Sequence, residues 1–175
     1  MDNKLDSRED ENEPQSIIIR SATNDDEEEI YTINLRSWGG GISTHELLEL
    51  RHGQLNNLPW IEQIAQAAAT HILDEDVKTF VAESNGRVIG YASAQLQGDK
   101  PEVGIVSYNA VDPDHRGQGV GTALVKHVMN YLKTHGARVL LVWTLEADEP
   151  ACRIYERLGF EELTRFVYYS YESQS

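Results

Sequence analysis

The sequence has little of what marks secreted, membrane-bound or repetitive proteins. Its 175 residues include one cysteine, Cys152, so no disulfide can form within the chain, which suits a reducing cytoplasm. No apolar run approaches the length of a membrane span, and residues 1–15 lack the apolar stretch of a signal peptide. No segment repeats at a fixed period. We expect a single soluble, cytoplasmic domain without a membrane partner.

Basic residues are also scarce. The chain has 15 Lys and Arg against 29 Asp and Glu, a formal net charge of −14 at pH 7. That balance disfavours nucleic acid or an anionic membrane as a partner, although it suits a cationic acceptor such as a polyamine. Solubility accounts for most of the charge. Residues 1–15 are polar and acidic and are predicted to be a disordered tail, whereas residues 16–175 are predicted to form the domain.

The most informative segment is residues 111–122, Val-Asp-Pro-Asp-His-Arg-Gly-Gln-Gly-Val-Gly-Thr. It is typical of a strand end and a turn, followed by a glycine-rich loop that opens into a helix. Such a loop points backbone N–H groups and the positive end of the helix dipole at one place. Its glycines let the backbone approach a ligand without a Cβ in the way. The segment therefore predicts a phosphate or pyrophosphate site.

Two other glycine-rich phosphate loops fit less well. A Walker loop needs Gly-Lys-Ser/Thr at its end, whereas Thr122 and Ala123 follow Gly121. A dinucleotide fingerprint needs another glycine at position 122 and an acid about twenty residues later, where residues 139–142 are apolar. A plain helix cap without a ligand remains as the structural alternative.

Three segments together resemble the GCN5-related N-acetyltransferases. Residues 116–121, Arg-Gly-Gln-Gly-Val-Gly, are similar to the family's pyrophosphate loop, and residues 151–160, Ala-Cys-Arg-Ile-Tyr-Glu-Arg-Leu-Gly-Phe, to its later tyrosine-containing helix. Residues 18–26 resemble its first strand and helix start. The resemblance implies an acetyl-CoA-dependent enzyme without a metal, and often a homodimer. It implies cofactor contacts by Asn109, Ala110, Val111, Arg116, Gly117, Gln118, Gly119, Val120, Gly121 and Thr122.

Periodicity predicts an α+β domain with a central mixed, mostly antiparallel sheet flanked by helices on both faces, which the resemblance also implies. Asn85-Gly86 between two apolar runs predicts a hairpin. Helices are expected at 24–37, 44–50, 60–73, 120–135 and 150–158, and strands at 17–20, 80–83, 88–94, 103–111, 139–145 and 165–171.

Acetyl transfer to an amine needs a neutral amine, a donor for the oxyanion, and a proton for the departing thiolate. The resemblance assigns the last task to Tyr155 and the second to the backbone N–H of Val111, beside a bulge that opens a slot for the pantetheine arm. The alternative for Tyr155 is core packing, since Ile154 and Leu158 flank it.

The sequence departs from the family pattern at the general base. The strand glutamate of some members corresponds to Ile105, which cannot take a proton. Glu83 and Glu102 are substitutes without a motif, and a water chain is another possibility. His45, His52 and His71 lie in the helical region where the family builds its acceptor site. No base is assigned from the sequence.

Three further features leave alternatives open. Asp148 stands where the family often has asparagine; an aspartate can accept from an amide N–H of the pantetheine arm but repels a phosphate. With Glu146 and Glu149 it forms either a site for a cationic acceptor or a solvated loop. Trp38 and Trp60 either box an ammonium group or belong to ordinary packing.

These observations predict an N-acetyltransferase that moves the acetyl group of acetyl-CoA to a primary amine by direct attack in a ternary complex. The expected acceptor is a small cationic amine. The alternatives are transfer to a protein N-terminus or lysine, and a non-catalytic acyl-CoA-binding regulatory module. The sequence does not reveal the acceptor, the acyl-chain preference or the oligomeric state.

Overall fold

The computed structural model describes residues 16–41, 43–98 and 100–173, and the predicted acidic tail at 1–15 lies outside them. Within this part of the chain, no helix is long and apolar enough to cross a membrane. The elements are β1 (Ile18–Ser21), a short η1 (Asn24–Asp26), α1 (Glu27–Ser37), α2 (Thr44–His52), α3 (Trp60–Thr70), a short η2 (His71–Leu73), β2 (Val77–Ser84), β3 (Arg87–Gln97), β4 (Lys100–Val111), a short η3 (Pro113–His115), α4 (Val120–Thr134), β5 (Val139–Leu141) and α5 (Glu149–Arg157).

The sheet is mixed and mostly antiparallel, as predicted. Its five strands lie in the order β1-β2-β3-β4-β5, and the first four pair antiparallel. β5 joins β4 in parallel because α4 carries the chain back across the sheet, and residues 103–105 pair with 139–141. The predicted hairpin is confirmed, since Asn85 (φ 52°) and Gly86 (φ 73°) both have the positive φ of a type I′ turn.

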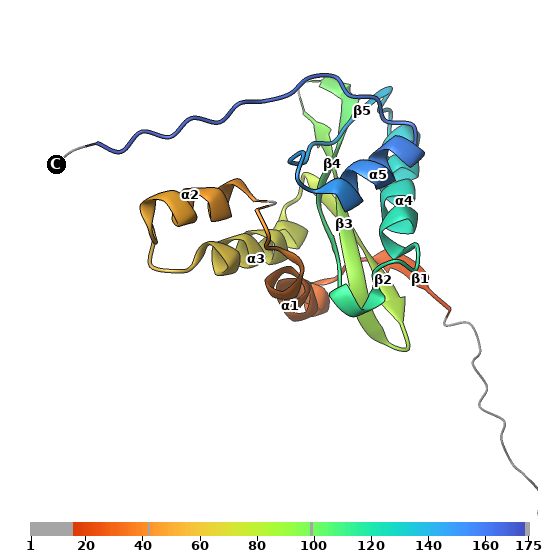
Figure 1. Cartoon of the computed structure of the whole chain (residues 1–175). Coiled ribbons are helices and arrows are strands. Elements are labelled where there is room, and N and C mark those ends of the chain that lie inside the picture. Colours follow the sequence, from red (N-terminus) through yellow and green to blue (C-terminus); the bar gives the residue numbers. More distant parts are fainter. Residues whose placement is uncertain (1–15, 42, 99, 174–175) are drawn as a thin grey trace, which may run out of the picture.

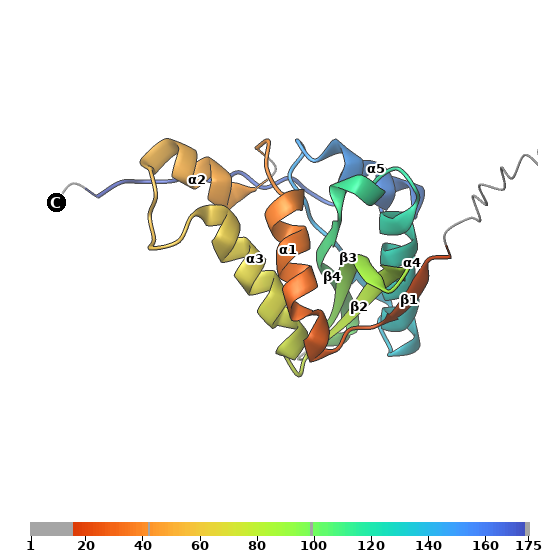
Figure 2. The same ribbon diagram turned by 90° about the horizontal axis from the view of Figure 1, so that it is seen from below.

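Helices cover both faces of the sheet, which confirms the predicted architecture. Figure 2 shows α1 and α3 on one side of the strands and α4 on the other. The α4 stripe is buried at every fourth residue, through Val120, Leu124, Val128 and Leu132, against one face of β2, β3 and β4. Gly136 (φ 98°) ends the helix in the left-handed conformation expected there.

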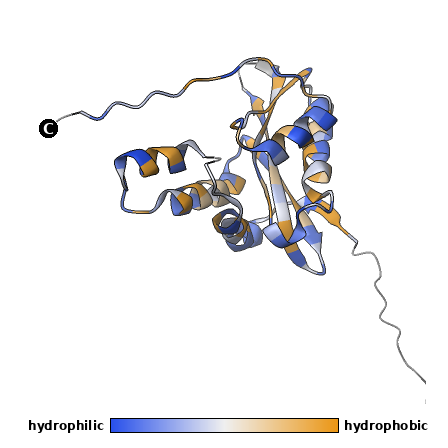
Figure 3. Cartoon of the chain, viewed as in Figure 1, coloured by the Kyte–Doolittle hydropathy of each residue, from blue (hydrophilic) through white to orange (hydrophobic). Residues whose placement is uncertain are grey.

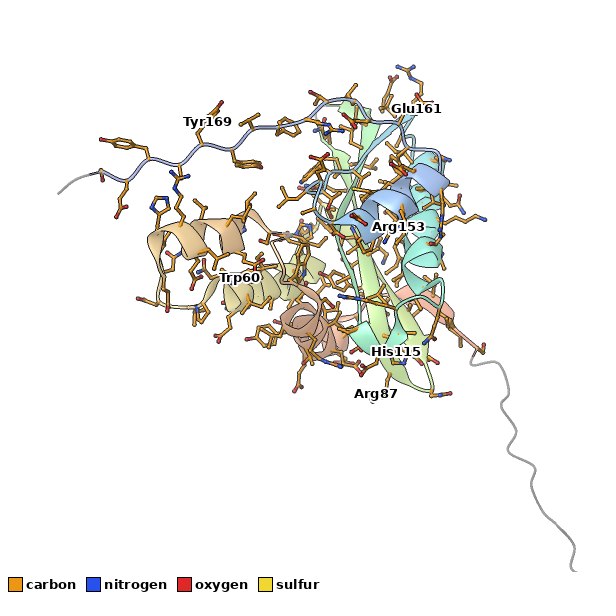
Figure 4. The ribbon with its side chains drawn as sticks, in the orientation of Figure 1. Trp60, Arg87, His115, Arg153, Glu161 and Tyr169 are labelled. Carbon is orange, nitrogen blue, oxygen red and sulfur yellow. The ribbon has the colours of Figure 1, made fainter. Side chains whose placement is uncertain are left out.

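The predicted last strand, residues 165–171, is wrong. Residues 161–173 run out from the body without a strand partner in the described chain (Figure 1). Figure 3 colours part of this segment hydrophobic, and in Figure 4 Tyr169 points away from the body; that residue is 92% exposed. Alternating apolar residues predict a strand, but a strand also needs an adjacent edge with which to pair.

The strand predicted at 139–145 is shorter than expected and ends at Leu141. Residues 142–145 follow β5 without pairing, because β4 pairs with β5 only at residues 103–105, in the first half of β4. Val139 is 43% exposed, so the prediction of a buried strand is wrong at that end. The two strands are therefore joined at one end and separate at the other, beside the glycine-rich loop.

Candidate active site

The glycine-rich loop presents unpaired backbone N–H groups at the start of α4. Gly117 (φ 76°) and Gly119 (φ 84°) are left-handed, and a Cβ at either position would meet nothing within 4 Å. The first helical bond runs from Ala123 N–H to Gly119 O at 3.0 Å. The N–H groups of residues 120–122 have no acceptor within the described chain, and the helix dipole adds to their positive potential. This arrangement suits a phosphate.

Gly121 has a different reason to be glycine. Its φ is ordinary, and a Cβ there would lie 3.1 Å from Ile154 Cδ1 on α5 and 3.4 Å from Val111 Cγ2. The small residue allows α5 to pack closely on the start of α4. Gly121 therefore supports the loop by packing, although its N–H group is one of those left without an acceptor.

Arg116 ties the loop to α1 and β4. Its Nη2 donates to Ser37 O at 2.8 Å and its Nε donates to Val111 O at 3.3 Å. Ser37 Oγ also donates to Val111 O, at 3.1 Å. The Arg116 guanidinium thus holds the end of β4 in place, while Gln118 Nε2 donates to Asp114 O at 3.4 Å.

Arg36, in the last turn of α1, braces the same junction. Its guanidinium bonds the Asp112 carboxylate and, at 2.8 Å, that of Asp114, and this contact lowers the pKa of Asp114. Asp112 also accepts from the Asp114 N–H at 2.9 Å. The turn that leads into the glycine loop is therefore anchored to α1 by side chains.

β4 carries a bulge just before this junction. Ala92 pairs with Asn109 and Ala94 with Val106, so residues 107–108 together face one residue of β3. β4 pairs with β5 only at 103–105, upstream of the bulge. Downstream of the bulge, no strand of the described chain lies beside the edge of β4, which is the opening expected for a pantetheine arm.

The backbone direction in this open stretch follows from the register. Asp112 N–H donates to Ile89 O at 2.9 Å, so in an antiparallel ladder the next bonded residue back is Ala110. The peptide groups of Asn109 and Val111 point away from β3, toward the open edge. Those of Ala110 point into the ladder, so the expected pantetheine contact by Ala110 lacks a free backbone group.

Tyr155 reaches this open stretch from α5. The residue is 8% exposed, and its ring lies edge-on to Phe160 with centroids 5.9 Å apart. Asn109 Nδ2 donates to the Tyr155 hydroxyl oxygen at 3.3 Å. Burial raises the pKa of Tyr155, an effect that the Asn109 bond opposes. A phenol in this setting keeps its proton at neutral pH and can donate it.

Comparisons with known proteins agree with this geometry. The family model described as the Acetyltransferase (GNAT) family matches residues 28–160. The chain belongs to the GNAT acetyltransferase family. An uncharacterized N-acetyltransferase of Methanocaldococcus jannaschii is 39% identical over 93 residues, which are 51% of this chain and 41% of that protein. The chain thus spans less than half the length of this curated relative.

Solved structures show the same fold. The ribosomal-protein-S18-alanine N-acetyltransferase of Escherichia coli superimposes with a TM-score of 0.63 at 26% identity, over 85% of this chain and 80% of that one. An aminoglycoside N-acetyltransferase in complex with CoA gives a TM-score of 0.66 at 19% identity, over 93% and 99%. GNAT acetyltransferases use acetyl-CoA, and the left-handed glycines, the free N–H groups at 120–122 and the open β4 edge fit that molecule.

The carboxylates considered as bases for this GNAT domain are bound elsewhere. Ile105 is 7% exposed and packs in the core. Glu83 accepts from Arg20 Nε at 2.7 Å, and Glu102 accepts from Arg138 Nη2 at 3.2 Å. Both carboxylates are therefore paired with arginines, and within the described chain neither is bonded to Tyr155 or Asn109.

The three histidines of the helical region differ in position. His45 is exposed on α2. His52 Nε2 lies 3.0 Å from Ser170 Oγ, so it contacts the C-terminal segment. His71, at the end of α3, lies with its Nε2 3.4 Å from Ser107 Oγ in the β4 bulge. Among the three, His71 is the one that reaches the open strand.

The acidic residues before α5 have partners. Asp148 caps α5 by accepting a backbone N–H at 3.2 Å. Glu146 pairs with Arg165 at 2.7 Å, and Glu149 pairs with Arg153 at 3.0 Å. These contacts favour the structural explanation of the cluster over a free anionic surface for a cationic acceptor.

Trp38 and Cys152 have structural surroundings. The Trp38 indole N–H donates at 2.8 Å to Asn34 Oδ1, which also accepts from the Tyr91 hydroxyl at 2.8 Å. This network joins the end of α1 to β3. Burial raises the pKa of the Cys152 thiol, which disfavours the reactive thiolate.

Sequence reasoning missed the side chains that surround His71. Ser107 and Tyr108 lie in a strand with no catalytic motif, 36 residues from His71 in the case of Ser107, and Asp74 lies in an exposed turn. The bulge was expected, but which side chains it would bring toward α3 depends on register. No local pattern in the sequence signals this contact.

Proposed function

We propose that this chain is an N-acetyltransferase that moves the acetyl group of acetyl-CoA to a primary amine by direct attack. The observation that carries the proposal is the Tyr155 hydroxyl, bonded to Asn109 at the open edge of β4. The phosphate loop lies at one end of that edge and the buried phenol lies beside it. A thioester whose pyrophosphate occupies the loop would then run along β4 toward Tyr155.

The residues of the chain supply four of the contacts that the reaction needs. The N–H groups at 120–122 bind the pyrophosphate, and the outward N–H and carbonyl of Asn109 pair with the pantetheine arm as in an added strand. The Val111 N–H donates to the oxyanion, because Ser37 and Arg116 hold the carbonyl of the same residue. Tyr155 gives its proton to the departing sulfur.

The proposed acceptor is a small cationic amine. The net charge of −14 favours the approach of a cation. A similar fold serves an aminoglycoside N-acetyltransferase, although at 19% identity that likeness concerns the fold alone. A peptide N-terminus is the second candidate, because the ribosomal-protein-S18-alanine N-acetyltransferase is 26% identical over most of this chain.

An acceptor screen with acetyl-CoA tests the proposal. Polyamines, amino acids, aminoglycosides and short peptides are incubated with the protein, and products are read by mass spectrometry. We expect Tyr155→Phe to lower kcat about 100-fold while CoA affinity stays unchanged, since the variant removes only the proton donor. Phe keeps the ring and its packing, so the melting temperature serves as the folding control. Equal turnover by wild type and variant would show that the tyrosine is structural.

A further inference from the structure

Asp74, His71 and Ser107 form a hydrogen-bonded row on the α3 side of the β4 bulge. Asp74 Oδ2 lies 2.8 Å from His71 Nδ1, and Ser107 Oγ lies 3.4 Å from His71 Nε2. The His71 side chain is 15% exposed and that of Asp74 is 59% exposed. The imidazole is thus largely enclosed, while its carboxylate partner remains in contact with solvent.

The carboxylate determines which ring nitrogen carries the proton. A carboxylate accepts, so His71 Nδ1 donates to Asp74 and Nε2 is left with a lone pair that faces Ser107. The Tyr108 ring lies edge-on to the imidazole, with centroids 5.1 Å apart, and limits its rotation. Among the described residues, Asp74 from the same turn and Tyr108 from β4 are the ionisable residues that contact the ring. Thr79, the neighbouring β2 residue on this face, is neutral.

This row and Tyr155 contact the same short stretch of β4, residues 107–109, from opposite faces of the sheet. Asn109 Nδ2 donates both to the Tyr155 hydroxyl, at 3.3 Å, and to Ser107 O, at 3.0 Å. α5 lies on one face of the sheet, whereas α3 and η2 lie on the other (Figure 1). A thioester beside the edge of β4 is therefore reached by a proton donor from one face and a proton acceptor from the other.

We propose that His71, oriented by Asp74, is the general base of the transfer, with the Ser107 hydroxyl as the relay between amine and imidazole. The inference rests on the proposed acetyl transfer. One proton of the substrate ammonium passes through Ser107 to His71 Nε2, and the neutral nitrogen attacks the thioester carbon. The C–N bond forms, the C–S bond breaks, and sulfur takes the proton of Tyr155. The phenol is reprotonated by the second proton that the nitrogen loses, and His71 releases its proton to solvent.

The test compares His71→Gln with His135→Gln in the full chain, since His135 is exposed at the C-terminal end of α4 and lies outside both the row and the proposed acceptor side. With an acceptor from the screen, we expect His71→Gln to lower kcat about 100-fold at neutral pH, whereas His135→Gln is unchanged. CoA affinity and melting temperature should match wild type in both. The pH profile of kcat/KM should lose its acidic limb in His71→Gln and recover in part at high pH, where the amine is neutral without help.

Two further variants locate the steps within the row. Asp74→Asn should lower kcat about 10-fold, because the amide no longer selects the tautomer with a free Nε2. Ser107→Ala should lower kcat and leave CoA affinity unchanged. A merely structural role would instead lower the melting temperature and leave the shape of the pH profile as in wild type.

Three outcomes overturn the inference. If His71→Gln and His135→Gln have equal kcat, acetyl transfer stands and the base lies elsewhere. If acetyl-CoA alone adds an acetyl group to Ser107, seen by peptide mass spectrometry, the serine is a nucleophile and the relay is wrong. If wild type transfers acetyl to no acceptor while it binds CoA, the proposed function is wrong, and the assignment of His71 as its general base is wrong as well.

Discussion

Helices α4 and α2 lie on opposite sides of the proposed reaction slot, and different kinds of contact hold them. α4 buries Val120, Leu124, Val125, Val128 and Leu132 against the sheet, whereas α2 has no buried residue. α2 lies away from the sheet in Figure 1 and is attached through carboxylates, with Glu46 and Glu49 accepting backbone N–H groups at 2.7 and 2.6 Å. The proposed phosphate side is built on the core, whereas the proposed acceptor side, at α2, is attached to it through these polar contacts.

This difference between α4 and α2 suits a proposed slot in which one substrate, acetyl-CoA, is constant and the other, the amine acceptor, varies. A phosphate loop made of backbone groups needs a rigid helix behind it, because N–H groups must stay aligned. An acceptor side with few buried contacts can change its side chains at little cost to folding. The comparison predicts large stability effects at α4 and specificity effects at α2.

The largest expected effect comes from a cavity under the C-terminal end of α4. Leu132 is fully buried, so Leu132→Ala should lower the free energy of unfolding by about 3 kcal/mol. Leu50 on α2 is 75% exposed, and Leu50→Ala should change it by less than about 0.5 kcal/mol. Urea unfolding of both variants measures the contrast. Similar losses in the free energy of unfolding would mean that α2 contributes to the stability of the core as much as α4 does.

The next effect concerns the loop itself. Gly119→Asp places a carboxylate beside the proposed pyrophosphate and should weaken CoA binding about 10-fold or more, measured by calorimetry. Gly136→Asp is the matched control, because Gly136 is also left-handed (φ 98°) but lies at the other end of α4. Both variants carry similar backbone strain, and only the first should affect CoA. Equal CoA affinity in the two would move the phosphate site elsewhere.

A similar contrast, between local features and contacts of distant segments, explains which parts of the molecule could be predicted from the sequence. The glycine-rich loop, the α4 stripe and the Asn85-Gly86 hairpin depend on local backbone conformation and periodicity, which neighbouring residues determine. The helix motif predicted Tyr155 as a site residue, and its catalytic role stays a prediction. The row at His71 depends on a bulge and on contacts between distant segments, so no local pattern marked it.

The prediction of a last strand at residues 165–171 is wrong for the same reason, because strand pairing depends on contacts between distant segments. Residues 165–171 alternate in a way that favours extended backbone, and in Figure 1 this segment runs as a drawn-out trace without a strand. Pairing depends on where the chain leaves α5 relative to a free sheet edge, which is a property of the whole fold. Local propensity predicted the conformation of the segment and not its partner.

The smallest expected effect sharpens the assignment of α2 to the acceptor side. Glu49 Oε2 accepts the Trp60 N–H at 2.6 Å and so joins α2 to the start of α3. Glu49→Ala removes that acceptor, at a cost of about 1 kcal/mol. With α2 less firmly placed, we expect KM for the amine to rise about 3- to 5-fold, while CoA affinity and kcat stay near wild type.

Glu28→Ala is the control for this variant, since Glu28 is an exposed acid on α1 and its loss changes the net charge by the same amount. If both variants raise KM equally, the effect is long-range attraction of a cation, which falls as salt is added. If Glu49→Ala alone raises KM, and the rise persists at high salt, α2 shapes the acceptor side through its position. A change confined to CoA affinity would place α2 beside the other substrate and reverse the comparison.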